Sequence, residues 1–215
     1  MHIPKKFQQD DSAKLEGLIR DYPFATLVTY SKQGVEANHL PVILTEIGDK
    51  KVLQAHIAKA NPLWKTVDDK SNVLVIFKGP DCYISPNNYP TKTETGRAVP
   101  TWNYVAVHVR GRMSYIQDPG VIKNMIDDLT TRHEAEQDAP WSTSDAPNGY
   151  IEKMLTAIVG LEIEISSITG MWKLSQNQPD TNISGVIAGL GSEGNHQQKA
   201  VAELVKEHAG KVSKG

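Results

Sequence analysis

The sequence has a single cysteine, Cys82, in 215 residues. One thiol cannot form an intramolecular disulfide, so we expect a protein of a reducing compartment, with a cytoplasmic location. Long apolar runs are also absent: segments such as NVLVIF have the length of a strand and fall far short of the about 20 residues of a membrane span. The first residues, MHIPKKFQQDDSAKLEGL, lack the apolar stretch of a secretory signal. We therefore expect no insertion into a membrane.

The chain has no excess of charge of one sign. Lys and Arg together number 23, Asp and Glu 25, and the formal net charge is −2. A protein that binds nucleic acid without sequence preference draws most of its affinity from neutralising phosphates, which requires a basic patch. Neither a dense Lys/Arg run nor a recognisable helix-turn-helix is present. We expect at most weak, steeply salt-dependent association with DNA, or action through another protein.

The common catalytic signatures are missing too. The sequence has no Gly-x-Ser-x-Gly elbow, no Walker loop, no Gly-x-Gly-x-x-Gly after a strand and no His-Glu-x-x-His. His133-Glu134 lacks the second histidine of a zinc protease, and Cys82 has no Cys-x-x-Cys partner. The sequence alone therefore assigns no catalytic residue and no metal site.

What is present begins with short, alternating β-rich segments after Pro23: FATLVTY, ANHLPVIL, KVLQAHI and NVLVIFKG. Turn signals at residues 31–34 and 48–49 separate them, which predicts an antiparallel meander. These intervals leave no room for crossover helices, so a barrel or sandwich is favoured over a parallel doubly wound sheet. Residues 79–100 are rich in Pro, Asn, Thr and Gly, and we expect a long loop there with one short strand at Cys82–Ile84.

Helices are predicted around these strands. One follows a cap at Asp11 or Ser12, a second follows Asp118 and Pro119, and a third covers YIEKMLTAI. The alternation in GLEIEIS then predicts a half-buried strand. The apolar stripes are Leu15, Leu18 and Ile19; Val121, Ile122, Met125, Ile126 and Leu129; Ile151, Met154, Leu155 and Ile158; and Val201, Leu204 and Val205. We expect a mainly β fold with flanking α-helices (α+β): residues 1–190 form one domain with inserted helices at about 118–158, and residues 191–215 form a helical tail.

The stretch AHIAKANPLW places two cationic side chains before a short helix. His56 and Lys59 follow a strand, and Asn61 begins the helix. Cations beside free N–H groups at a helix start suit a phosphate. The alternative is structural: an Asn cap, a surface lysine and a packed histidine.

The stretch VPTWNYVAVHVRG predicts a strand with two different faces. One face carries Trp102, Tyr104, Ala106, His108 and Arg110, and the other carries Asn103, Val105, Val107 and Val109. The valine face belongs to the core. The aromatic and cationic face suits a planar anionic ligand or a subunit interface, with a half-exposed strand as the alternative.

The stretch GMWKLSQNQPDTNISGVIAGL collects hydrogen-bonding groups before a turn. Lys173, Ser175, Gln176 and Asn177 supply one cation and several uncharged groups, and amides pair well with the edge of a heteroaromatic ring. A polar strand end and loop is the alternative.

Taken in order, MHIPKKF, AHIAKANPLW, CYISP, VPTWNYVAVHVRG, GLEIEI and WKLSQNQ with GVIAGL resemble the PaiB family of FMN-binding split-barrel proteins, from about Met1 to Leu190. The resemblance implies a split β-barrel with flanking helices, a homodimer and FMN at the subunit interface. It also implies a negative transcriptional regulator of the kind that controls protease synthesis and sporulation.

The same resemblance implies roles for individual residues. His56, Lys59 and Asn61 become candidates for the phosphate and ribityl region. Trp102 and Tyr104 would flank the isoalloxazine, beside His108, with Lys173, Gln176 and Asn177 as polar contacts from the same or the partner subunit. Two positions depart from the family pattern: Asn88 stands where a Trp precedes the Tyr, and Asn182-Ile183 where an Asp-Arg pair precedes Gly-Val. Loss of that Arg removes a cation with bidentate reach to phosphate.

Two other functions stay open. A flavin-dependent oxidoreductase of the same architecture would need no catalytic triad, because the flavin carries the chemistry. A haem-binding split barrel, by analogy of fold, would use His39, His56 or His108 as an axial ligand.

Overall fold

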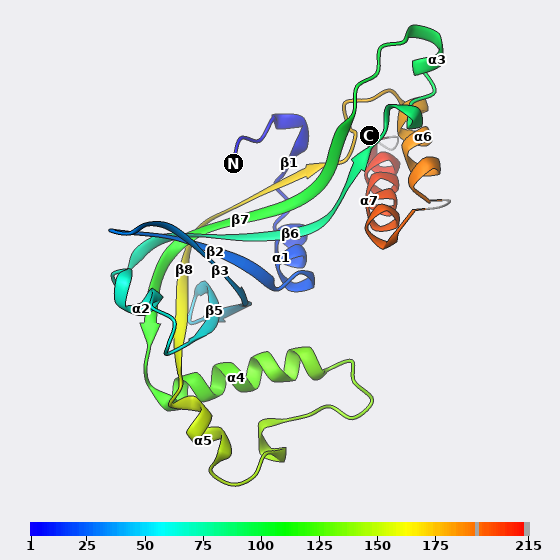
Figure 1. The fold of residues 1–215 in the computed structure, drawn as a ribbon. Helices are drawn as coiled ribbons and strands as arrows, with labels where there is room; N and C mark the ends of the chain where they lie inside the picture. Colours follow the sequence, from blue (N-terminus) through cyan, green and yellow to red (C-terminus); the bar gives the residue numbers. More distant parts are fainter. Residues whose placement is uncertain (192–193, 213–215) are drawn as a thin grey trace. The chain divides into compact units, whose positions relative to one another are not determined.

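The computed structural model describes residues 1–191 and 194–212. The chain divides into two compact units, and each is described by itself. Unit 1 comprises Met1–Asp21, Lys78–His108 and Thr169–Gly215, and unit 2 comprises Tyr22–Phe77 and Val109–Ile168. Three long strands contribute residues to both units: β6 (Ser71–Ile84), β7 (Thr101–Ile116) and β8 (Ile158–Lys173) (Figure 1).

The strands form one eight-stranded sheet in the order β3-β2-β6-β7-β8-β5-β4, and β1 also pairs with β8. The registered pairs β1–β8, β2–β3, β2–β6, β4–β5 and β5–β8 are all antiparallel. This confirms the mainly β class with flanking helices. The remaining strands are β1 (Gln8–Gln9), β2 (Phe24–Ser31), β3 (Gly34–Pro41), β4 (Ile43–Ile47) and β5 (Lys50–Ala58).

The segment ANHLPVIL forms two strands where one was expected. Pro41 has no N–H to give to a ladder, and the N–H of Val42 donates to Pro23 O at 2.9 Å. The chain therefore leaves β3 at Pro41 and re-enters the sheet as β4 at Ile43.

The core of unit 2 follows the alternation of its strands. On β5, Leu53, Ala55 and Ile57 are buried, and they lie opposite Ile163, Leu161 and Val159 of β8, which are also buried. Glu162 and Glu164 lie on the other face, where Lys50 pairs with Glu164 at 2.9 Å. The half-buried strand expected from GLEIEIS is confirmed.

The helices are α1 (Ser12–Asp21), α2 (Leu63–Thr66), α3 (Lys92–Thr95), α4 (Pro119–Glu134), α5 (Tyr150–Leu155), α6 (Asp180–Gly191) and α7 (His196–Val212). Asp11 Oδ1 accepts from the N–H of Ala13 at 3.0 Å, and Asp118 Oδ1 from the N–H of Val121 at 2.9 Å, so both predicted caps are confirmed. The prediction that Val121 belongs to the buried stripe of α4 is wrong: Val121 is exposed, while Ile122 and Met125 are buried.

Helix α5 is shorter than its apolar stripe. It ends at Leu155, and Ile158 begins β8. Ala157 O accepts from the N–H of Lys59 at 2.7 Å, and Ile158 pairs with Ala58. Pairing with β5 therefore ends the helix before the fourth position of the stripe.

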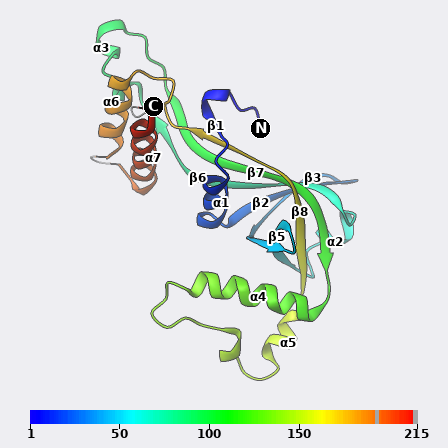
Figure 2. The ribbon, with the colours of Figure 1, turned by 180° about the vertical axis from the view of Figure 1, so that it is seen from behind.

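Two helices close the chain in unit 1. Helices α6 and α7 lie side by side in both views (Figures 1 and 2). Val201 and Val205 of α7 are buried, as the tail stripe predicted, and Val186 and Leu190 of α6 are buried as well. Within the described ranges, no helix has the length and apolarity needed to cross a membrane.

Cys82 is buried in β6. Burial raises the pKa of its thiol to about 11, and the charge of Asp81 adds to the rise. The group is therefore a protonated thiol at neutral pH.

Candidate functional site

The nine predicted site residues fall into two groups, one in each unit. His56, Lys59 and Asn61 belong to unit 2, at the end of β5 and the start of α2. Trp102, Tyr104 and His108 of β7 belong to unit 1, together with Lys173, Gln176 and Asn177 at the end of β8.

In unit 2, Asn61 caps the short helix α2. Its Oδ1 accepts from the N–H of Leu63 at 2.9 Å, and its Nδ2 donates to Asn38 Oδ1 at 2.7 Å. Both ends of the amide are thus used within the protein. For Asn61 the structure therefore shows the structural alternative, an asparagine that caps a helix.

The hydroxyl of Tyr115 makes a second contact with the same helix. Tyr115 Oη lies 3.1 Å from Leu63 O and 3.0 Å from Val67 O. Burial raises the pKa of the Tyr115 phenol to about 12, with smaller contributions from the charges of Asp69 and Asp68. The phenol therefore stays a donor at any physiological pH and holds α2 at both ends.

His56 and Lys59 retain free hydrogen-bonding capacity. His56 is partly buried, and its Nδ1 has no partner among the described residues. Burial lowers the pKa of the imidazole, so it is neutral at pH 7. The Lys59 ammonium has only a long contact, 3.4 Å, to Thr156 O, and no ion pair within the described ranges. An unpaired cation and a partly buried imidazole fit an anionic group.

Lys59 also lines a pocket of unit 2 with a volume of about 410 Å³. Apolar and polar residues line it together: Lys59, Gln117, Pro119, Glu152, Leu155, Thr156, Ile158 and Val159. This volume lies within the range of about 300–1,000 Å³ that is typical of small-molecule sites. The pocket carries one cation and one carboxylate.

In unit 1, β7 has the two faces that its alternation predicted. Asn103, Val105 and Val107 are fully buried, as is Val109 where β7 enters unit 2, whereas Trp102 is 53% exposed. Trp102 meets Tyr83 edge-on, with ring centroids 6.2 Å apart. Tyr104 Oη donates to Met171 Sδ at 3.1 Å, and His108 is half-buried. Exposed aromatic rings on a rigid strand suit a planar ligand or a protein surface.

The turn after β8 is braced by its own side chains. Gln176 Oε1 accepts from the N–H of Leu174 at 2.7 Å, and its Nε2 donates to Trp172 O at 2.5 Å. Lys173 Nζ donates to Thr101 Oγ1 at 2.7 Å, while Asn177 is exposed. Gln176 is therefore largely committed to the turn, and Asn177 is the amide left to face a ligand.

The two departures from the family pattern meet in unit 1. Asn88 packs against the helix α6, where a Cβ at Gly185 would clash with Asn88 O and one at Gly189 would lie 2.6 Å from Asn88 Oδ1. Asn182 is buried; its Oδ1 accepts from Thr91 Oγ1 at 3.0 Å, and its Nδ2 donates to Gln178 Oε1 at 3.0 Å. Here the two asparagines hold the segment around residues 88–91 against α6.

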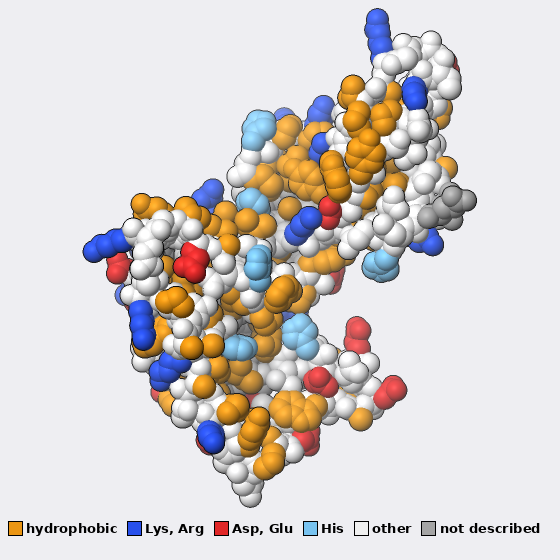
Figure 3. Space-filling model, in the orientation of Figure 1, with side chains coloured by type: hydrophobic (Ala, Val, Ile, Leu, Met, Phe, Trp, Pro, Cys, Tyr) orange, Lys and Arg blue, Asp and Glu red, His pale blue; other side chains and the backbone are white. Residues whose placement is uncertain are grey.

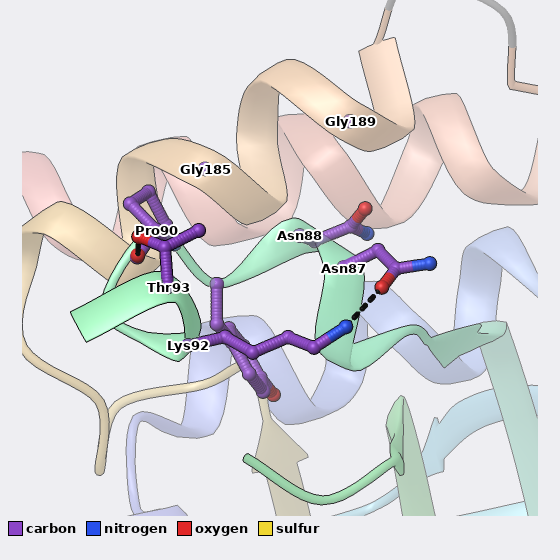
Figure 4. A pocket seen from close by; sticks show the side chains of 8 residues that line it. Asn87, Asn88, Pro90, Lys92, Thr93, Gly185 and Gly189 are labelled. Atoms are coloured by element: carbon purple, nitrogen blue, oxygen red, sulfur yellow. Dashed lines mark hydrogen bonds between the residues drawn. The ribbon is translucent and has the colours of Figure 1, made fainter. Parts of the chain in front are cut away.

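A second pocket, of about 370 Å³, opens at this contact (Figure 4). Lys92 Nζ reaches Asn87 Oδ1 at 2.6 Å along one wall, and Gly185 and Gly189 of α6 form another. Sequence reasoning missed this helix and this pocket. The Gly-x-x-x-Gly spacing at 185–189, which lets a backbone approach closely, was the signal that could have found them.

Comparison with known proteins places the chain in a family. Residues 1–167 match a family described as "Putative FMN-binding domain". The protease synthase and sporulation protein PAI 2 of Bacillus subtilis is 32% identical over 96% of this chain and 97% of its own. An uncharacterised protein of Emericella nidulans is 32% identical over 90% of this chain and 91% of its own.

Solved structures show the same fold. The FAD and haem binding protein from Mycobacterium smegmatis superimposes with a TM-score of 0.59 at 17% identity, covering 85% of this chain and 80% of that chain. The flavocytochrome Anf3 from Azotobacter vinelandii gives a TM-score of 0.53 at 15% identity, covering 80% and 72%. The fold is the split barrel of flavin proteins, with a sheet whose path ends at β3 and β4. The chain belongs to the PaiB family of FMN-binding split-barrel proteins.

Proposed function

We propose that this chain is a cytoplasmic, FMN-binding regulator that acts as a homodimer and lowers transcription, as a sensor or carrier of FMN. The Bacillus subtilis relative, named for protease synthesis and sporulation, supports the regulatory part. The observation that carries the FMN part is the unit 2 pair: a Lys59 ammonium that forms no ion pair among the described residues and, three positions earlier, a His56 Nδ1 without a partner among them.

Each group of residues has a separate role in this proposal. His56 and Lys59 would contact the phosphate and ribityl end, and Asn61 would act through the helix that it caps. In unit 1, Trp102, Tyr104, His108, Lys173 and Asn177 would contact a flavin ring, and Gln176 would hold the turn beside them. When bound, FMN supplies one- and two-electron redox chemistry. The residues of the chain would orient it, with Lys59 at the phosphate and Trp102 beside the ring.

The aromatic face of β7 supports the homodimer. Trp102 and Tyr83 are both exposed and touch each other, and large exposed aromatic side chains are typical of interface centres. DNA is the less favoured partner. On the face shown in Figure 3, Lys and Arg side chains lie apart instead of forming one dense patch. The proposed regulation therefore works through a protein partner, or through weak, salt-sensitive contact with DNA.

The proposal is tested by titrating the purified protein with FMN and then adding reduced nicotinamide without oxygen. We expect saturable binding with quenched flavin fluorescence, and an oxidised spectrum that persists after the nicotinamide is added. Rapid bleaching of the flavin would instead identify an oxidoreductase. Absence of binding both with and without oxygen would remove FMN from the proposal.

Trp102→Ala is expected to weaken FMN binding about tenfold or to loosen the dimer, because it removes a large aromatic surface from the β7 face. Light scattering after gel filtration reports the dimer, and fluorescence titration reports the affinity. Trp141→Ala is the matched control, since Trp141 is exposed to a similar degree in the connection between α4 and α5. If dimer and affinity both survive in Trp102→Ala, the role given to Trp102 is wrong.

A further inference from the structure

Asn103 is the polar exception on the buried face of β7. Its side chain is 0% exposed and shares that face with Val105, Val107 and Val109. Its Nδ2 donates to Ser175 Oγ at 2.8 Å, and its Oδ1 has no partner among the described residues. A buried amide that makes one bond is less stable in this place than a valine, which would continue the row. Packing alone does not explain the asparagine.

Ser175 is a second exception, and it is the partner of the first. It is 3% exposed and has φ +64°, in the left-handed region that disfavours any residue with a Cβ. Glycine would adopt this conformation without strain. Glycine would also lack the hydroxyl that Asn103 binds. The serine therefore combines an unfavourable backbone with the one side chain that the buried amide uses.

This bond joins the two stretches of unit 1 that carry the proposed ring contacts. Trp102 and Tyr104 flank Asn103 on β7, whereas Gln176 and Asn177 follow Ser175. The turn itself closes through the N–H of Gln178, which donates to Ser175 O at 2.9 Å.

The chain of bonds continues beyond the turn. Gln178 Oε1 accepts from Asn182 Nδ2, and Asn182 Oδ1 accepts from Thr91 Oγ1. The conformation at Ser175 therefore fixes the position of residues 176–178. Through the bond between Gln178 and Asn182 it also fixes the position of the first turn of α6.

We propose that Asn103 and Ser175 are positioning residues: their buried hydrogen bond locks the turn at residues 174–178 in the conformation that presents Asn177 to the flavin ring. The ligand in this inference rests on the proposed function, whereas the locking of the turn does not. Strained backbone and incompletely bonded buried groups gather where binding geometry matters more than stability. In unit 1 both occur in one pair of residues, between the two sets of proposed ring contacts.

The test compares Asn103→Val with the wild type by three measurements. The melting temperature is expected to hold or rise, because the incompletely bonded amide is gone. Amide hydrogen exchange at residues 174–178 of the protein without FMN is expected to quicken about tenfold, and the dissociation constant for FMN to rise about tenfold. A residue that served stability alone would not weaken binding while the melting temperature held.

Three further variants complete the design. Ser175→Ala keeps the backbone strain and removes the hydroxyl, so it should reproduce both effects, and the double variant should add nothing to either single one. It also carries the test should Asn103→Val not fold. Thr29→Val is the matched control: Thr29 is 3% exposed in β2 of unit 2, and its Oγ1 also lacks a partner among the described residues. This control should leave exchange at residues 174–178 and FMN affinity unchanged.

The outcomes separate this inference from the proposed function. Unchanged exchange at residues 174–178 in both variants overturns the locking of the turn. Quickened exchange with unchanged FMN affinity overturns the positioning role. If the wild type takes up no FMN, the proposed function fails together with the ligand, and the exchange arm still decides whether the pair locks the turn.

Discussion

Gly111→Ala is expected to lower the free energy of unfolding by about 3 kcal/mol, through overpacking against a neighbouring backbone. A Cβ at Gly111 would clash with Glu164 O and lie 2.6 Å from Ile163 Cγ2. Both neighbours belong to β8, whose register with β5 pairs Ile163 with Leu53 and Glu164 with Val52. The obstacle is therefore a paired strand and not the end of a flexible side chain, so it cannot move away cheaply. Urea denaturation followed by circular dichroism measures the loss.

Gly17→Ala is the matched control for this substitution. A Cβ at Gly17, in α1, would meet nothing within 4 Å. Alanine in a helix interior is favoured over glycine by about 1 kcal/mol, so this variant should be the more stable one. If Gly111→Ala unfolds at the same urea concentration as the wild type, β8 does not approach β7 as closely as the structure has it.

Lys59→Met is expected to raise the dissociation constant for FMN by about 30-fold, because a charge-assisted hydrogen bond contributes about 1.5–3 kcal/mol. Methionine keeps most of the apolar stem and removes the charge. Riboflavin, which has the same ring and no phosphate, should bind the variant and the wild type equally. Fluorescence titrations with both flavins separate loss of the phosphate contact from damage to the rest of the site.

The control for Lys59 is Lys65→Met. Lys65 lies on α2 near the same segment, with its Nζ 5.1 Å from the centre of the Trp64 ring. Its loss should change neither titration. Equal weakening of FMN and riboflavin in Lys59→Met would mean that Lys59 supports the fold of the site and does not contact the phosphate.

Much of the fold was predictable because it depends on local periodicity. The alternation in VPTWNYVAVHVRG identified the buried face of β7, and the caps at Asp11 and Asp118 marked two helix starts. The lengths of the strands were not predictable. Residues 79–80 and Gly111 were taken as boundaries, yet β6 runs on to Ile84 and β7 to Ile116. At Gly111 the missing side chain admits the backbone of β8, which is a fact of tertiary structure that no local pattern contains.

The site was predictable in part, for a related reason. Residue type and alternation were enough to single out Lys59 and Trp102. The roles of Asn103, Ser175 and Asn182 depend on partners 72, 72 and 91 positions away in the chain, and the left-handed backbone of Ser175 has no signal in a serine. Asn61 and Gln176 were expected to face a ligand, but their amides serve the α2 cap and the turn.

The buried thiol of Cys82 can report how often β6 opens locally. Because the group is protonated and shielded at neutral pH, an alkylating reagent reacts with it only while β6 is locally open. The rate of alkylation therefore counts openings of unit 1. Since the chain has no other cysteine, a cysteine introduced at an exposed position can be labelled selectively in the native state, which makes the wild-type background suitable for fluorescence or spin-label spectroscopy.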